Sequence, residues 1–210
     1  MQTAPEAISD AGAVEIRVLG CLIEKQRTTP DVYPLSLNTL RLACNQSTNR
    51  DPVMELDEGA IRDALDELSR RRWARLASGA GSRAVKFRHL LDEALGLSGA
   101  ELAVLAVLML RGPQTPGELR QRVERLQRFA SGEELMATVD GLIARALVAR
   151  LPRRPGQKEE RYLQLLGELG DETDVPSGAA EARPDRLSEL ESRVARIEEQ
   201  LAELLERLGG

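Results

Sequence analysis

An internal repeat limits the folds open to this chain more than any other feature of its sequence. The stretch EIRVLGCLIEKQRTTP (15–30) aligns with ELAVLAVLMLRGPQTP (101–116) at a constant offset of 86 residues, and LDELSRRRWARL (65–76) resembles VDGLIARALVAR (139–150) at an offset of 74. The offset falls by 12 because the first copy carries extra residues between the two blocks. The repeat predicts that one small fold occurs twice. The identical pairs are Glu15/Glu101, Val18/Val104, Leu19/Leu105, Leu22/Leu108, Thr29/Thr115, Pro30/Pro116, Asp66/Asp140, Leu68/Leu142 and Arg71/Arg145.

Each copy has the pattern of three helices. In the first copy, apolar residues at helical spacing predict a helix around residues 14–23, a short second helix around residues 37–44 and a third around residues 61–68. Asp57 is a suitable N-cap for the third helix. In the second copy Ser98 and Ser131, each followed three residues later by Glu, predict capping boxes at the starts of the first and third helices.

A β-hairpin is expected after each third helix. The stretch WARLASGAGSRAVKFRHL (73–90) has two short extended segments around a glycine-rich tip, and LVARLPRRPGQKEERYLQLL (147–166) has its tip at Pro155-Gly156. Helix, helix, helix, hairpin is the order of a winged helix-turn-helix domain. The predicted fold is therefore mostly α with small β-hairpins (α+β), as tandem winged helix-turn-helix domains at 11–92 and 97–166.

The C-terminal part of the sequence has a different character. Residues 167–184 lack periodicity and are rich in Gly, Pro, Asp and Glu, which predicts a flexible linker. Residues 185–208 carry an a/d heptad seam and predict a coiled-coil helix. A helix of this length is marginal alone, so we expect a homodimer, with docking on the protein's own body as the alternative. The seam residues are Leu187, Leu190, Val194, Ile197, Leu201, Leu204 and Leu208.

Several classes of protein have little support in this sequence. The longest apolar run, Leu102 to Leu110, is about half of a membrane span, and the N-terminus has no secretory signal, so we expect a cytoplasmic protein without a membrane partner. Cys21 and Cys44 lack metal or redox spacing and are expected to be buried and reduced. His89, the only histidine, is expected to be partly exposed and structural or phosphate-contacting. No catalytic motif, metal site or cofactor site is recognisable, so we expect no enzyme activity.

Positive charge is concentrated near the predicted hairpins. The net charge of −5 divides into −7 for residues 168–210 and +2 for residues 1–167. Two runs without an acid coincide with the end of a third helix and its hairpin, where a winged helix commonly meets DNA phosphates. The alternative is that Arg-rich composition decorates any exposed hairpin. The candidate phosphate-binding residues are Arg70, Arg71, Arg72, Arg75, Arg83, Lys86, Arg88, Arg145, Arg150, Arg153, Arg154 and Lys158.

A polar run follows the predicted second helix of the first copy. It consists of Asn45, Gln46, Ser47, Thr48, Asn49 and Arg50. Amides and Arg can read base edges or contact a protein partner. The same groups can instead cap the helix and satisfy backbone groups in a buried loop, and the sequence does not decide between these roles. The third helix exposes several carboxylates, which makes base reading by that helix doubtful.

The segment TPDVYPLSLNTLRLACNQSTNRDPVMEL (29–56), followed by RDALDELSRRRWARL (62–76), resembles the YceH family of uncharacterised bacterial proteins. The resemblance covers about residues 13–166 and implies tandem winged-helix domains, often with a C-terminal coiled coil, in the bacterial cytoplasm. It implies no ligand, activity or set of functional residues.

The leading hypothesis is a dimeric, non-enzymatic protein that binds duplex DNA, as a transcriptional regulator. The alternative is a protein-protein interaction adaptor built on the same domains. A small-molecule sensor with a pocket between the two copies is a third hypothesis, without a residue set that identifies a ligand.

Overall fold

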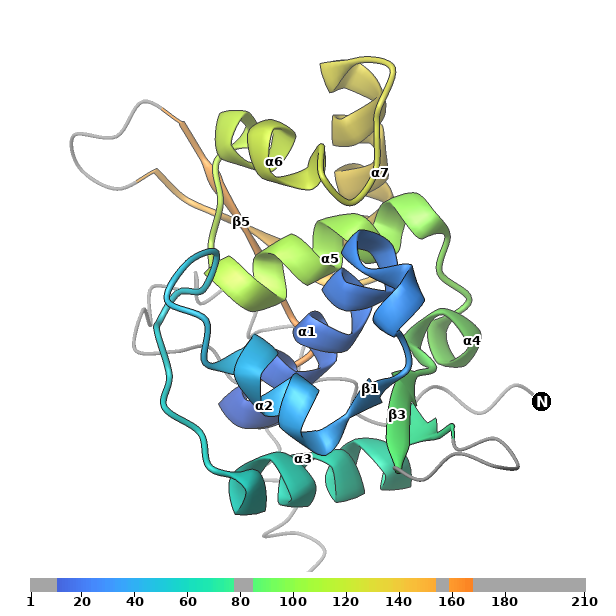
Figure 1. The fold of residues 1–210 in the computed structure, drawn as a ribbon. Helices are drawn as coiled ribbons and strands as arrows, with labels where there is room; N and C mark the ends of the chain where they lie inside the picture. The colour runs from blue at the N-terminus through green and yellow to red at the C-terminus, as the bar shows by residue number, and fades with distance from the viewer. Residues whose placement is uncertain (1–10, 78–84, 154–158, 168–210) are drawn as a thin grey trace, which may run out of the picture. The chain divides into compact units, whose positions relative to one another are not determined.

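The computed structural model describes residues 11–77, 85–153 and 159–167 of the 210-residue chain. Within these ranges it contains seven α-helices and two small antiparallel sheets, so the fold is mixed α+β (Figure 1). The predicted coiled-coil helix, nearly all of the predicted linker and both hairpin tips lie outside the described residues. So do three candidate phosphate-binding residues, Arg83, Arg154 and Lys158.

The first copy forms three helices and a three-stranded sheet. The predicted Asp57 cap of α3 is confirmed, since Asp57 Oδ1 accepts from Ala60 N at 2.8 Å. Ser36, which was not predicted as a cap, starts α2 in the same way: its Oγ accepts from Thr39 N at 3.3 Å. The strand order is β1-β3-β2, and the two-residue strand β1 was not expected from the sequence. The elements are α1 (Ala13–Thr28), a 3₁₀ helix η1 (Pro30–Val32), β1 (Leu35–Ser36), α2 (Leu37–Cys44), α3 (Glu58–Arg70), β2 (Ala74–Leu76) and β3 (Lys86–His89).

The second copy repeats this order with a two-stranded sheet. Gln114 forms an isolated bridge with Tyr162 beside that sheet, where the first copy has β1. The Ser98 capping box is confirmed. At Ser131 only half of the box forms, because the carboxylate of Glu134 accepts from Ala130 N. After a short connecting helix α4 (Leu91–Leu95), the elements are α5 (Gly99–Arg111), α6 (Pro116–Val123), α7 (Gly132–Ala144), β4 (Val148–Leu151) and β5 (Arg161–Gln164).

The Thr-Pro match of the repeat does not mark equivalent structure. Thr115 is the N-cap of α6 and Pro116 its first residue. Thr29 instead follows α1 as its C-cap, and Pro30 begins the short 3₁₀ helix η1. The loop before the third helix is also longer in the first copy, where it spans residues 45–57, than in the second, where it spans residues 124–131. The polar run lies in this longer loop.

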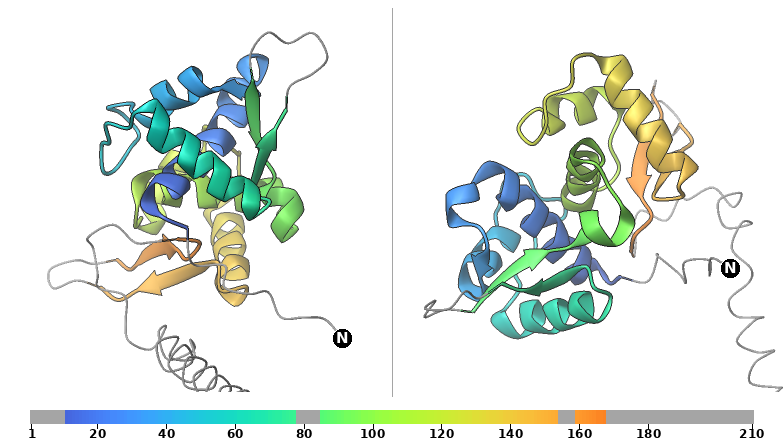
Figure 2. Two further views of the ribbon diagram at one scale, coloured as in Figure 1. Left: turned by 90° about the horizontal axis from the view of Figure 1, so that it is seen from below. Right: turned by 90° about the vertical axis from the view of Figure 1, so that its right-hand side faces the viewer.

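The two copies share one hydrophobic core, built around the packing of α1 against α5 (Figures 1 and 2). Both helices are buried on nearly every side, and the apolar run Leu102–Leu110 is buried throughout. The helices approach closely at Gly20, where a Cβ would lie 3.0 Å from the Leu110 side chain. In the described ranges, no helix combines the length and apolar character needed to cross a membrane. The apolar run is thus a core element.

Candidate functional site

Exposed positive charge is found on the hairpin of the first copy. Arg72 and Arg75 are exposed and Lys86 is half-buried, and none of the three has an ion-pair partner in the part of the chain that the structure describes. Arg72 follows the last turn of α3 with φ 60°. Arg75 on β2 lies opposite Arg88 on β3 in the antiparallel register, which brings two guanidinium groups to one face of the sheet.

The other basic residues of this run are partly neutralised by acids from elsewhere in the chain. Arg70 pairs with Glu67, and Arg88 Nη2 lies 2.5 Å from Glu93 Oε1. Arg71 pairs with Glu15 and stacks over the Trp73 ring, with 5.7 Å from its guanidinium carbon to the ring centroid. No acid occurs between residues 70 and 88 of the sequence, but in the fold acids from outside this segment lie beside three of its arginines.

The second hairpin is more fully neutralised. Arg145 pairs with Glu101 at 2.9 Å and also donates to the carbonyl of Leu95. Arg150 lies 3.5 Å from each of Asp140 and Glu160, and its guanidinium covers the Tyr162 ring. Arg153 is exposed. Among the described residues, the hairpin of the first copy therefore carries more unpaired positive charge than that of the second.

The polar run divides into buried and exposed residues. Asn45 uses both ends of its amide on Leu56, accepting from its N–H at 2.8 Å and donating to its carbonyl at 2.7 Å. Asn49 has φ 60°, and its side chain accepts a hydrogen bond from Arg111. Gln46 accepts from Arg50 at 3.1 Å. Ser47 and Thr48 are exposed and remain available for contacts with a partner.

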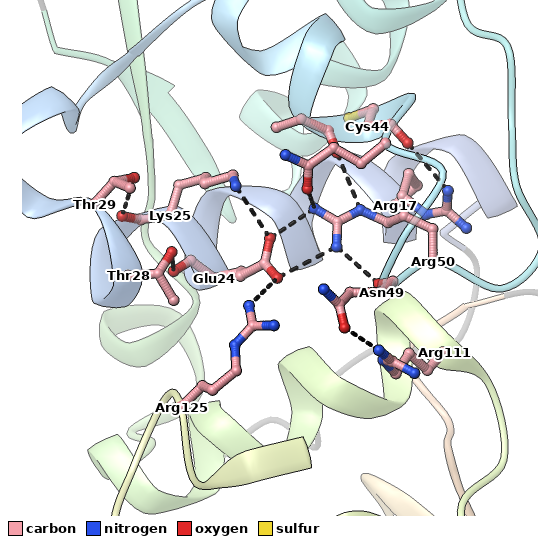
Figure 3. Close-up of polar contacts among 12 residues, drawn as sticks. Arg17, Glu24, Lys25, Thr28, Thr29, Cys44, Asn49, Arg50, Arg111 and Arg125 are labelled. Atoms are coloured by element: carbon pink, nitrogen blue, oxygen red, sulfur yellow. Dashed lines mark hydrogen bonds and ion pairs between the residues drawn. The ribbon is translucent and has the colours of Figure 1, made fainter.

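Arg50 is a structural residue, in contrast to the contact role that the sequence allowed. Its side chain is fully buried, and its two terminal nitrogens bind the Glu24 carboxylate at 2.6 and 3.3 Å (Figure 3). Its Nε donates to the carbonyl of Ala43 at 3.0 Å. Burial alone would lower the pKa of Arg50, but its hydrogen bonds with Glu24 raise the pKa above the ordinary value. A buried, paired guanidinium cannot reach a base edge.

A second buried arginine holds the other end of the loop. Arg17 is 1% exposed and donates to the carbonyls of Cys44 at 3.2 Å and Pro52 at 2.6 Å. The backbone N–H of Asp51 donates to the carbonyl of Leu110 at 2.8 Å, which ties the loop to α5 of the second copy. The long loop of the first copy therefore connects the two copies.

His89 was expected to be partly exposed, but it is buried, with 2% of its surface exposed. Its Nε2 lies 2.7 Å from Gln26 Oε1, and its backbone N–H donates to Tyr33 Oη at 2.8 Å. Burial lowers its pKa to about 4, so the ring is neutral at pH 7. A buried, neutral ring does not contact a phosphate, and the role of His89 is structural.

Cys21 and Cys44 are both buried and reduced, as expected. Among the described residues, no three His, Cys, Asp or Glu side chains are grouped to hold a metal ion. Sequence reasoning missed Arg17 and Glu24, because neither has a motif of its own. Glu24 precedes its partner Arg50 by 26 residues, so only the folded chain brings them together.

Comparison with known proteins gives a single family. A family model described as "Protein of unknown function, DUF480" matches residues 12–157. A UPF0502 protein of Shewanella sp. (strain ANA-3) is 47% identical over 205 residues, covering 92% of this chain and 94% of its own length. The UPF0502 protein YceH of Salmonella arizonae is 44% identical over 208 residues (94% and 97%), and a UPF0502 protein of Geotalea uraniireducens is 50% identical over 195 residues (91% and 88%).

Proposed function

The chain belongs to the DUF480 (UPF0502) family, and since neither name states a function, we propose that it is a non-enzymatic DNA-binding protein that grips phosphates with the hairpin of its first copy. The membership agrees with the resemblance to YceH that the sequence suggested. We propose transcriptional regulation as its role, because non-enzymatic duplex binding by paired small domains is typical of regulators.

The order of elements supports a winged helix-turn-helix in each copy. The first copy has the order α1, β1, α2, α3, β2, β3, and the second has α5, the Gln114 bridge, α6, α7, β4, β5. In such domains the third helix lies at the DNA and the hairpin contacts the backbone. α3 and α7 lie on opposite sides of the α1–α5 pair (Figure 1), so the two third helices face different directions.

The observation that carries the proposal is the unpaired charge of the exposed Arg72 and Arg75 and the half-buried Lys86. None of the three has an acidic ion-pair partner among the described residues, and they lie together at the end of α3 and on its hairpin. Phosphate contacts need such charge, since counterion release supplies most of the sequence-independent affinity. Asp63 and Asp66 are exposed on α3 and would repel phosphates, which favours backbone contacts by the hairpin over base reading by α3.

The proposal is tested by fluorescence anisotropy with random duplex DNA between about 50 and 200 mM salt, the range in which phosphate contacts weaken visibly. Wild-type protein is expected to bind with a steep salt dependence. In the Arg72→Gln/Arg75→Gln variant the slope of log affinity against log salt should become shallower by about 2. Each phosphate contact contributes roughly −0.9 to that slope, and the variant loses two contacts.

The matched control is Arg120→Gln/Arg128→Gln, which removes two exposed arginines around α6. It lowers the net charge equally and should leave the slope nearly unchanged. An equal effect of both variants would mean that net charge, and not the hairpin, governs binding. No binding by wild-type protein at low salt would overturn the proposal.

The acidic surface of α3 favours the second candidate, a protein-protein interaction adaptor. Removing two charges with Asp63→Asn/Asp66→Asn separates the two functions. If α3 faces DNA, the variant should bind duplex DNA more tightly, because two repulsive charges are gone. If α3 instead holds a basic protein partner, DNA binding should not change and a partner that copurifies stoichiometrically should be lost.

We also propose a homodimer through the seam Leu187 to Leu208, which rests on the sequence alone. Light scattering on the full chain should give twice the monomer mass, and Leu201→Pro should give the monomer mass because proline breaks a helix interior. A monomeric wild-type protein would refute the seam as a dimer interface.

A further inference from the structure

A hollow of about 350 Å³ lies between the two copies, apart from the basic hairpin. The first copy contributes Glu24 from α1 and Asn49 from the long loop, and the second contributes Arg111 from the end of α5 and Arg122 and Arg125 from and just after α6. α6 lies above the α1–α5 pair in Figure 1, whereas β3 lies below it. The apolar part of the lining includes Val107, Leu110 and Leu126.

Positive charge exceeds negative charge in this hollow. Of the described residues that line it, Glu24 alone is acidic, and its carboxylate is already held by the buried Arg50 at 2.6 Å. Arg125 reaches the same carboxylate at 3.5 Å and keeps 55% of its side chain exposed. One buried carboxylate is thus shared by a buried and an exposed guanidinium, and it cannot neutralise both (Figure 3).

Of the remaining two arginines, Arg122 is partly neutralised and Arg111 adds to the excess. Arg122 pairs with Glu118 at 3.2 Å, in a contact with partly exposed side chains. Arg111 donates to the neutral amide of Asn49 and has no carboxylate partner among the described residues. Burial lowers the pKa of Arg111 below the ordinary value, and the charges of Arg122, Arg125 and Arg50 lower it further. These cations repel one another, and a bound anion would relieve that repulsion.

The lining also restricts the chemistry of the anion. The planar guanidinium fork matches phosphate oxygens in pairs, and three forks converge here from two segments. The volume is within the range of small-ligand pockets, and the apolar side chains can cover a carbon portion. We propose that the hollow binds the phosphate group of a small phosphorylated molecule, with Arg111, Arg122 and Arg125 as its ligands. Glu24, itself held by Arg50, positions Arg125, while Asn49 positions Arg111.

This site goes beyond the DNA-binding proposal and does not depend on it. Its position does suit an effector, because the hollow joins the long loop of the first copy to α5 and α6 of the second. All three arginines belong to the second copy, and a ligand that they hold would also lie against Asn49, from the long loop of the first copy, which binds Arg111.

Isothermal titration calorimetry at constant ionic strength tests the site, with inorganic phosphate and glucose 6-phosphate as separate probes and succinate for comparison. Wild-type protein should bind a phosphate probe at one site per chain. Tighter binding of glucose 6-phosphate assigns a phosphate ester, and equal binding assigns free phosphate. The Arg122→Gln/Arg125→Gln variant should bind at least about tenfold more weakly, because two charge-assisted hydrogen-bonding groups are lost.

The Arg120→Gln/Arg128→Gln variant is the matched control, since both residues are exposed and neither lines the hollow. It should bind the probe as the wild type does. Because Arg125 contacts the buried Glu24, circular dichroism and the melting temperature establish that each variant folds, and Arg122→Lys provides a milder change that keeps the charge but loses the fork.

Three results would overturn the proposal. One is no saturable binding of either phosphate probe by wild-type protein, or stronger binding of succinate than of both. Another is equal weakening in the test and control variants. The third combines two observations: duplex DNA displaces phosphate from the wild-type protein, and the Arg122→Gln/Arg125→Gln variant no longer binds DNA. Together they would mean that the hollow binds a phosphate of DNA and not a small molecule.

Discussion

Glu15 at the start of α1 and Arg71 at the end of α3 form an ion pair, with 3.4 Å between Oε2 and Nε. The second copy repeats this pair with Glu101 and Arg145, whose Oε1 and Nη1 are 2.9 Å apart. Glu15 matches Glu101 and Arg71 matches Arg145 in the internal repeat. The repeat therefore preserves a link between the first and third helices. Arg71 and Arg145, two of the candidate phosphate ligands, are better explained by this link.

The Glu15–Arg71 pair should stabilise the fold measurably. Its side chains are only 15% and 27% exposed, so solvent screens it less than a surface pair. A double-mutant cycle with Glu15→Gln and Arg71→Gln, followed by urea denaturation, should give a coupling free energy of about 1 kcal/mol. The control pair Glu67–Arg70 is more exposed, at 42% and 69%, and should give about 0.3 kcal/mol. Equal coupling in the two cycles would contradict this ranking.

Periodicity allowed the helices and hairpins to be predicted, because local spacing determines which face of an element is buried. The apolar positions of α1, α2 and α3 repeat at helical spacing, and Asp57 and Ser98 precede their helices as caps do. The strand β1 could not be predicted, since two residues carry no pattern and their pairing with β3 depends on the folded hairpin.

The site was less predictable because its charges meet over long sequence distances. Arg71 looked free of acids in its own segment, yet its partner Glu15 lies at the other end of the first copy. The sequence left open whether the polar run that contains Arg50 contacts a partner or belongs to a buried loop, and Glu24, which pairs with Arg50, lies 26 residues earlier in the chain. The cations around Arg111 could not be grouped either, since the packing of α5, α6 and the long loop brings them together.

Removing Arg50 should destabilise the protein strongly. Arg50→Met leaves the Glu24 carboxylate buried with only Lys25 and Arg125 at 3.7 and 3.5 Å, which should cost about 3 kcal/mol in the free energy of unfolding. The double variant Glu24→Met/Arg50→Met removes both charges and should lose much less. Ser47→Ala, at an exposed position of the same loop, is the control and should change stability by under about 0.5 kcal/mol. Urea denaturation measures all three, and a double variant that loses as much stability as Arg50→Met, or more, would argue against a coupled pair.

The two cysteines should be unreactive in the folded protein. Cys21 and Cys44 are both 0% exposed, and a hydrogen bond with Cys21 together with burial raises the pKa of the Cys44 thiol. Burial keeps the reagent from both thiols, and the raised pKa keeps Cys44 in the unreactive thiol form, so a disulfide reagent at pH 8 should label neither residue without denaturant and both in urea. Rapid labelling of the native protein would show that this part of the core opens readily.

His89 should make the stability of the fold depend on pH. Burial lowers its pKa to about 4 in the folded protein, against 6.5 for the exposed ring, while Asp92, with Oδ1 3.5 Å from Nδ1, opposes this shift. Below pH 6.5 the unfolded chain binds a proton that the folded chain does not take up until about pH 4. The contribution of His89 is therefore complete above pH 6.5 and is lost as the pH falls toward 4.

Urea denaturation at pH 7 and pH 5 measures this loss, which should be about 2 kcal/mol for the wild type. Carboxylates also titrate near pH 5, so the matched variant is His89→Gln, which keeps a polar group near Gln26 and lacks the ionisable ring. The difference between pH 7 and pH 5 should shrink by about that amount in the variant. If the variant shows the same difference in the free energy of unfolding between pH 7 and pH 5 as the wild type, carboxylates alone set the pH dependence. The imidazole of His89 would then have the same pKa in the folded and unfolded protein.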